Sequence, residues 1–335
     1  MTTRLGLDVF SLRSQGWSPF EQLEFCARRG IGVVHFSEPR FIGGFDREHL
    51  RRVRARAGEL GIQLEIGILS ICPSSSIFNP SNGTAHEQLT HAIDAALILE
   101  SPIVRCVVGR FIDRTSEGGI DARIADAVRV LTSVRPRVLD AGVKIAVENH
   151  AGDMQARELR RLVEEVGPDV IGACIDAGNA LWAMEDPHLT LETLAPYVLT
   201  SHVRDSAVRG TAEGAEVAWT RMGEGNVRIE DYLRTFVKRC PSAPVTLEVI
   251  VMPAPRALPF RDPRFWDGYR TTPAWEFQRF LDLVDSAASV PLPSGEVTAE
   301  QELENVDASI RWTQRCLRNL VRVNSQPPTP NSQDE

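Results

Sequence analysis

The chain has 335 residues, of which 43% are hydrophobic, and its formal net charge at neutral pH is −8. This length allows one large domain or two ordinary ones, the hydrophobic content supports a substantial core, and the acidic balance disfavours a nucleic-acid partner held by electrostatic attraction. No apolar run reaches 18 residues, so the sequence predicts no membrane-spanning helix and no membrane partner. Six scattered cysteines without a CxxC pair, and no signal peptide, predict a reduced, cytoplasmic protein.

Short apolar strands alternate with helices along most of the chain. The expected strands lie at 5–10, 33–36, 62–68, 103–108, 144–148, 170–176, 198–203 and 245–250. A first helix begins with Ser18 as its N-cap and Pro19 as its first residue, and it continues to Arg28. The later helices are expected at 47–60, 84–99, about 121–140, 156–166, 189–194 and 229–240.

Eight strands alternating with helices predict an α/β fold with a parallel sheet. The count of eight favours closure into a (β/α)8 TIM barrel, which we expect to span residues 1–285 and to carry catalysis. Because crossover connections are right-handed, all eight strands point the same way. Their carboxyl ends therefore share one rim, where such barrels place their active sites.

The region after the eighth strand predicts a C-terminal extension. The segment 252–272 is rich in proline and aromatic residues, and its length favours a lid or a subunit contact. Residues 286–335 comprise a linker, an amphipathic helix and a polar tail from about Ser325 that we expect to be disordered. The apolar stripe of that helix requires a partner, either the barrel flank or another subunit, so a homo-oligomer is one expectation.

Four of the expected strands end in ionisable side chains: Glu148, Asp176, His202 and Glu248. A carboxylate at the end of a buried strand is unfavourable unless it is paired or coordinated. Convergence of the four would form a site for one divalent metal ion. Three carboxylates and one imidazole suit Mn²⁺ best, and Mg²⁺, Co²⁺ or Zn²⁺ are also compatible with these donors.

Each of these four residues also has a purely structural interpretation. Glu148 or Glu248 could pair with an arginine across the rim, with Arg105 and Arg204 both available. Asp176 could cap the turn that follows it, and His202 could be a core histidine with satisfied hydrogen bonds.

Other polar residues at the same depth are expected to contact a substrate. His150, two positions beyond Glu148, is a candidate acid or base, or alternatively a histidine outside the site. Arg105 could bind a substrate carboxylate or phosphate, or it could be the counter-ion of Glu65 or Glu148. The expected substrate contacts are Arg105, Asn179, Arg204, His35 and Glu65.

The order of these motifs resembles the xylose-isomerase-like TIM barrel superfamily over roughly residues 5–285. The sequence has Glu148, then Asp176-Ala177-Gly178, then His202-Val203-Arg204-Asp205, then the Gly223-Glu224-Gly225 loop, then Glu248. The resemblance implies that Glu148, Asp176, His202 and Glu248 hold the metal. It also implies that Glu148 and Glu248 transfer protons on either face of the substrate.

The resemblance implies a divalent-metal-dependent isomerase or epimerase that converts a keto-sugar or sugar derivative through an enediolate. A metal-dependent lyase acting on an oxidised sugar, sugar acid or keto-glycoside by decarboxylation, dehydration or β-elimination is the alternative. Asn179 and Arg228 stand where ketose epimerases of the superfamily carry His and Asp, which keeps the lyase open. A metal-free sugar-binding barrel is the third hypothesis. The expected partner is a small carbohydrate.

Overall fold

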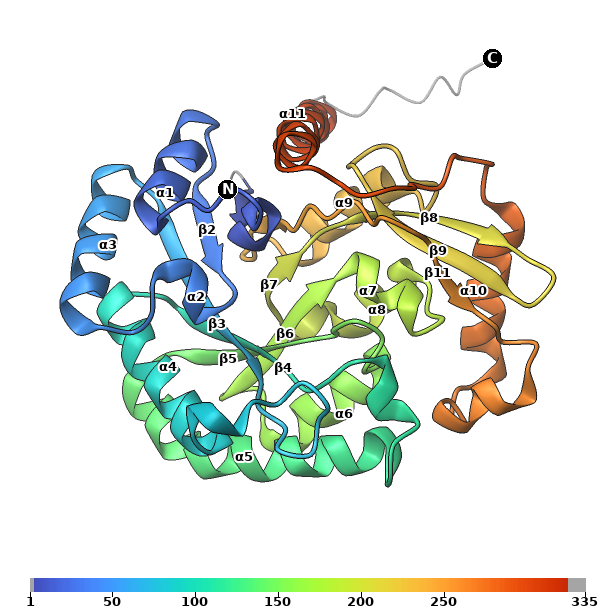
Figure 1. The fold of residues 1–335 in the computed structure, drawn as a ribbon, viewed down its shortest axis with the longest axis horizontal. Coiled ribbons are helices and arrows are strands. Elements are labelled where there is room, and N and C mark those ends of the chain that lie inside the picture. Colours follow the sequence, from blue (N-terminus) through green and yellow to red (C-terminus); the bar gives the residue numbers. More distant parts are fainter. Residues whose placement is uncertain (1–2, 325–335) are drawn as a thin grey trace, which may run out of the picture.

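The computed structural model describes residues 3–324, and its centre is a closed parallel barrel (Figure 1). The barrel strands are β1 (Leu5–Asp8), β2 (Val33–Phe36), β3 (Gln63–Ser70), β4 (Ile103–Val107), β5 (Lys144–Glu148), β6 (Ile171–Asp176), β7 (Val198–His202) and β10 (Val245–Leu247). Neighbours pair in parallel in the order β10-β1-β2-β3-β4-β5-β6-β7. A parallel bridge between Val203 and Leu247 closes the ring, so the predicted TIM barrel is confirmed.

Helices connect the strands (Figure 1). They are α1 (Pro19–Arg28), α2 (Pro39–Ile42), α3 (Arg47–Glu59), α4 (Ala85–Leu99), α5 (Gly119–Ala141), α6 (Ala156–Val166), α7 (Ala177–Trp182), α8 (Pro187–Leu194) and α9 (Ile229–Arg239). Local sequence determines several starts: the Ser18 side chain accepts a hydrogen bond from the Glu21 amide, as predicted, and Thr84 caps α4 in the same way. Every residue of β4 and β6 is buried, as expected for strands covered on both faces.

A second, smaller sheet was not predicted. Strands β8 (Asp205–Gly210), β9 (Ala215–Thr220) and β11 (Arg256–Leu258) form an antiparallel sheet in regions expected to be loops. Val208, Val217 and Leu258 pack together with Phe280 of α10 (Ala274–Ser286), which gives this sheet its own apolar cluster. The sheet is therefore stabilised by contacts between distant segments rather than by a local pattern.

Two barrel strands end two or more residues earlier than expected. The first strand stops at Asp8, and residues Val9–Leu12 form the 3₁₀ helix η1 instead of continuing to Phe10. The eighth stops at Leu247, so Glu248 lies just beyond it. Both early endings place a carboxylate at the rim.

The C-terminal helix α11 (Ala299–Asn324) packs on the barrel flank, against η1 and α9 (Figure 1). Its buried side chains, including Val306 and Ile310, join the main apolar core. Glu302 accepts hydrogen bonds from the Ser14 amide at 3.0 Å and the Ser14 hydroxyl at 2.9 Å. The barrel thus supplies the partner that this helix required, and self-association and the domain boundary at 285 stay predictions. The expected polar tail lies outside the described residues.

The segment 252–272 packs against the barrel and α10. Its second half forms the 3₁₀ helix η5 (Pro263–Gly268), and Tyr269 joins the cluster around Phe280. Arg114 donates a hydrogen bond to the Gly268 carbonyl at 2.8 Å, with its guanidinium carbon 4.1 Å from the centre of the Tyr269 ring. These contacts fix the segment against the loop that follows β4.

All six cysteines are buried, as the sequence predicts, and none of them is paired with another. Among residues 3–324, no helix combines the length and the apolar character needed to cross a membrane.

We expect Gly172→Ala to lower the free energy of unfolding by about 2 kcal/mol, because it overpacks β6 against the start of β7. A methyl group there would lie 2.4 Å from the Tyr197 carbonyl oxygen and 2.7 Å from the Leu199 side chain. Gly58→Ala in α3 is the matched control, since nothing lies within 4 Å of its added methyl group. It should raise stability by roughly 0.5–1 kcal/mol through helix propensity. Urea unfolding measures both, and unchanged stability of Gly172→Ala would contradict the packing.

Candidate metal centre

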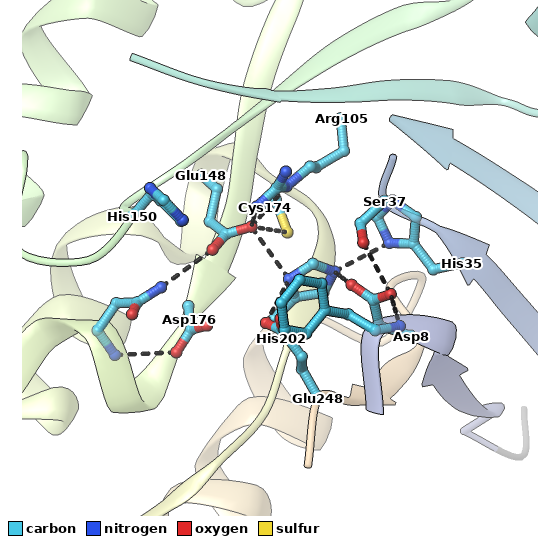
Figure 2. A network of polar contacts seen from close by, with 12 residues as sticks. Asp8, His35, Ser37, Arg105, Glu148, His150, Cys174, Asp176, His202 and Glu248 are labelled. Carbon is cyan, nitrogen blue, oxygen red and sulfur yellow. Dashed lines mark hydrogen bonds and ion pairs between the residues drawn. The ribbon is translucent and has the colours of Figure 1, made fainter. Parts of the chain in front are cut away.

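Four ionisable side chains meet at the carboxyl-end rim of the barrel. Glu148, Asp176 and His202 are the last residues of β5, β6 and β7, and Glu248 directly follows β10. Because these strands are parallel and lie on neighbouring parts of the ring, their ends converge (Figure 2). Glu148, Asp176 and His202 have no exposed surface, and Glu248 is 5% exposed.

The four side chains lie close enough to share one ion. The Nδ1 atom of His202 lies 3.0 Å from Glu148 Oε2 and 3.1 Å from Glu248 Oε2. One ligand atom from each of Glu148, Asp176, His202 and Glu248 can be chosen so that all four lie within 4.8 Å of one another. We call these four residues the ligand cluster.

The surroundings of the His202 ring test whether a cation fits. Its Nε2 atom lies 3.2 Å from Asp8 Oδ2 and 3.0 Å from His35 Nδ1, whereas Nδ1 is buried and makes no hydrogen bond. If Nε2 carries the ring proton, the lone pair of Nδ1 faces two carboxylates. A cation between them would turn this repulsion into coordination, and three carboxylates with one imidazole suit a hard to borderline divalent ion.

The same carboxylates hold a proton on His202 in competition with such an ion. Burial alone would lower the pKa of His202, but Glu148, Glu248 and Asp8 outweigh burial and raise that pKa well above its usual value. Ligands must lose their protons to bind a metal, so ion binding would release the His202 proton.

Two buried arginines neutralise the carboxylates. Arg105 donates from Nε to Glu148 Oε2 at 2.6 Å, and Arg204 donates from Nε to Asp176 Oδ2 at 2.8 Å and from Nη2 to Glu248. Burial would raise the pKa of Glu148, but Arg105 and His202 hold it well below its usual range. Arg204 and His202 likewise overcome burial and lower the pKa of Glu248 to about 2. The arginine pairing anticipated as a structural alternative is thus present beside the cluster.

Asp176 combines capping with membership of the cluster. Its Oδ1 accepts hydrogen bonds from the amides of Gly178 at 2.7 Å and Asn179 at 2.9 Å, at the start of α7. Its Oδ2 faces Arg204. Asn179 then donates from Nδ2 to Glu148 Oε1 at 3.0 Å. The first turn of α7 therefore joins the ends of β5 and β6.

His150 lies beside Glu148 at the edge of the cluster (Figure 2). Its Nδ1 atom lies 2.7 Å from the carbonyl oxygen of Gly109, which can only accept, so Nδ1 carries the hydrogen. Nε2 is then the atom left free to accept a proton. Burial lowers the pKa of His150, which keeps the ring neutral.

His35 and Glu65 lie behind His202, inside the barrel. Both are essentially fully buried, and the Glu65 carboxylate accepts a hydrogen bond from the Thr200 hydroxyl at 2.6 Å. Glu65 Oε2 is also 3.7 Å from His35 Nδ1, which contacts His202. The structure therefore places them behind His202 in the ligand cluster, and their contact with substrate stays a prediction.

Asp8 belongs to the same network and was missed from the sequence. Its Oδ1 accepts hydrogen bonds from the Phe10 amide and the Ser37 hydroxyl, both at 2.9 Å, and its Oδ2 faces His202. Burial raises the pKa of Asp8 to about 6, although His202 opposes the shift. The signal was present, because Asp8 ends an apolar run, but extending the strand to Phe10 hid it.

This architecture belongs to the class of TIM barrels that carry a polar centre at the carboxyl ends of their strands. Residues 23–269 match the family described as xylose isomerase-like TIM barrel, and the chain belongs to that family. The superfamily resemblance seen in the sequence is confirmed.

The chain is similar to a curated relative and to solved structures of the same fold. The 3-oxo-isoapionate decarboxylase of Pectobacterium atrosepticum is 25% identical over 185 residues, which are 55% of this chain and 60% of that protein. The chain thus spans less than two thirds of that relative's length.

The structure of L-ribulose 3-epimerase has a TM-score of 0.63 at 15% identity, over 98% of this chain and 100% of that one. D-psicose 3-epimerase from Clostridium cellulolyticum H10 has a TM-score of 0.58 at 14% identity, over 84% and 98%. At these identities the two structures show the shared fold alone.

We expect Asp176→Asn to weaken Mn²⁺ binding roughly tenfold or more, since it removes a charged ligand atom. Glu185→Gln is the matched control: Glu185 is also buried, accepts hydrogen bonds from the Ala156 amide and the Thr190 hydroxyl, and lies outside the cluster. Isothermal titration with Mn²⁺ measures both affinities. Equal affinity of Asp176→Asn and the unaltered protein would contradict the ligand assignment.

Proposed function

We propose that this protein is a divalent-metal-dependent isomerase or epimerase that converts a keto-sugar or sugar derivative through an enediolate. The observation that carries the proposal is the ligand cluster, in which four ligand atoms from four strand ends lie within 4.8 Å of one another. Membership of the xylose isomerase-like family and the epimerases that share the fold support it.

Glu148, Asp176, His202 and Glu248 hold the ion in this proposal, and Mn²⁺ is the ion we expect. When bound, the ion supplies a Lewis acid that stabilises negative charge developing on substrate oxygen. The cluster offers four protein ligands, which leaves coordination positions for substrate.

Glu148 and Glu248 are the proton-transfer groups in this proposal. One carboxylate removes the proton from the carbon beside the carbonyl, and the other returns a proton to the opposite face or the neighbouring carbon. Both are ionised at neutral pH, because their arginine partners lower their pKa values. Arg105 and Arg204 bind substrate oxygens as well, and sharing their charge with substrate makes the carboxylates stronger bases.

His150 and Asn179 complete the proposed site. The Nε2 atom of His150 accepts a proton or a hydrogen bond from a substrate hydroxyl, because Nδ1 is committed to the Gly109 carbonyl. Asn179 holds Glu148 through its Nδ2 hydrogen bond and contacts substrate at the same edge. His35 and Glu65 act indirectly by orienting His202.

A lyase reaction is the second candidate, and two observations favour it. The relative from Pectobacterium atrosepticum is named a decarboxylase, and Arg105 and Arg204 both lie at the cluster, where they fit a substrate carboxylate. In a decarboxylation the electron pair of the broken carbon–carbon bond forms the enediolate. CO₂ leaves and a proton takes its place, so the same site serves either reaction.

We expect the Mn²⁺-loaded protein to exchange carbon-bound hydrogen of its keto-sugar for deuterium in D₂O, and Glu148→Gln to abolish this exchange. The amide cannot accept the proton, and the measurement is proton NMR of a panel of ketoses. Glu185→Gln should exchange like the unaltered protein. Exchange retained in Glu148→Gln would refute the role of Glu148 as a base.

The second candidate predicts release of CO₂ from a 3-oxo sugar acid, with loss of the carboxyl carbon detected by carbon NMR. Isomerisation instead gives exchange and new isomers without loss of mass. Removing the ion with EDTA should stop either reaction, since both need stabilisation of the enediolate. Activity that survives EDTA, in protein shown to contain no metal, would rule out metal dependence.

A further inference from the structure

Above the ligand cluster, three aromatic side chains and one arginine from four different loops meet. Phe111 lies in the 3₁₀ helix η3 (Phe111–Arg114) after β4, and Trp182 ends α7 after β6. Trp219 lies on β9 after β7, and Arg256 lies on β11 after β10. All four are half-buried. Loops that follow the strands line the face where TIM barrels bind substrates.

These four residues form a continuous stacked surface, which we call the aromatic shelf. The rings of Trp182 and Trp219 are nearly parallel, with centres 4.5 Å apart and an angle of 13° between their planes. The guanidinium carbon of Arg256 lies 3.6 Å from the centre of the Phe111 ring and 4.8 Å from that of Trp182. The pairing of β11 with β9 places Arg256 opposite Val217, one diagonal step from Trp219.

The aromatic shelf adjoins the ligand cluster. Arg204 donates a hydrogen bond to Asp176, and its guanidinium carbon lies 4.1 Å from the centre of the Trp219 ring. Trp219 also lies over Gly178, where a methyl group would approach its Nε1 atom to 2.9 Å. Glycine at position 178, two residues after Asp176 of the ligand cluster, therefore lets the Trp219 ring pack directly on the backbone. A molecule bound at the cluster and extending outward therefore reaches the shelf.

Arg256 differs from its neighbours in its charge environment. In the same segment, Arg264 pairs with Asp262 at 2.8 Å and Arg270 pairs with Asp267 at 2.6 Å. Among residues 3–324, no carboxylate lies within ion-pair distance of Arg256. A half-buried cation without a counter-ion is unfavourable, and stacking on two rings compensates only part of that. Burial accordingly lowers the pKa of Arg256.

We infer that the aromatic shelf is a substrate subsite for an oxyanion, a carboxylate or a phosphate, at the end of the substrate remote from the ligand cluster. A guanidinium presents parallel N–H groups that match either anion. Its stacking on Phe111 and Trp182 holds it flat and leaves its edge for the ligand. The assignment of the reactive end rests on the proposed function.

The test compares three probes that share a keto-sugar body: D-fructose, D-fructose 6-phosphate and 5-keto-D-gluconate. Each is titrated into Mn²⁺-loaded protein, with binding measured by calorimetry and by indole fluorescence. We expect at least one anionic probe to bind the unaltered protein more tightly than D-fructose. Arg256→Gln should weaken that anion roughly 10- to 100-fold, the effect of losing a charged hydrogen bond, and leave D-fructose unchanged.

Two further variants sharpen the comparison. Arg256→Lys retains the charge but not the planar fork, so its affinity for the anion should lie between those of the unaltered protein and Arg256→Gln. Arg264→Gln is the matched control, because it removes an exposed arginine of the same segment that pairs with Asp262. It should bind all three probes like the unaltered protein.

The outcomes separate this inference from the proposed function. If Arg256→Gln weakens binding of only one of the two anionic probes, the anionic group of that probe is the one that the subsite binds. Equal binding of all three probes to Arg256→Gln and the unaltered protein overturns the subsite, as does an unaltered protein that prefers neither anion to D-fructose. Metal content and Mn²⁺ affinity, measured on the same samples, should not change in Arg256→Gln. A protein that binds no metal but keeps Arg256-dependent anion binding would refute the metal site and retain the subsite.

Discussion

The concentration of negative charge at one buried point governs the organisation of this barrel. Parallel strands deliver Glu148, Asp176 and Glu248 to the same rim, where water is too scarce to solvate three carboxylates. Positive charge must accompany them, and Arg105 and Arg204 provide it. The arginines do not act alone, because the Nδ1 atom of His202 also lies between two of the carboxylates, 3.0 Å from Glu148 and 3.1 Å from Glu248.

The groups behind His202 determine how it meets that charge. Asp8 and His35 both face its Nε2 atom, so the ring is held by its inner edge and presents Nδ1 to the rim. Glu65 and Thr200 continue this network toward the barrel axis. At metal sites, a histidine ligand is usually oriented by a hydrogen bond from its second ring nitrogen. Here the groups that would orient the His202 ring in this way lie inside the barrel.

The sequence predicted the barrel and the cluster because both depend on local signals. Eight apolar runs separated by helices indicate the fold, and a polar residue at the end of a run, such as Glu148, indicates the rim. Asp8 also ends an apolar strand, but the predicted strand continued to Phe10 and so placed Asp8 in its interior. The antiparallel sheet around β8 and β9 was missed because its stability comes from packing on α10, about 60 residues further along the chain. Arg256 lies beside Phe111 and Trp182, which are also distant from it in the sequence, so this contact could not be predicted either.

The segment 252–272 links the antiparallel sheet to the aromatic shelf. It packs on α10, contacts Arg114 and carries Arg256, whose guanidinium lies over the Phe111 ring. The ligand cluster lies at strand ends, whose positions the barrel imposes, whereas the aromatic shelf is built from segments that follow the strands and can vary more freely. In the two proposals, the groups that carry the chemistry are therefore separate from those that choose the substrate. A change at Arg256 alters which molecule is held without disturbing the charges around His202.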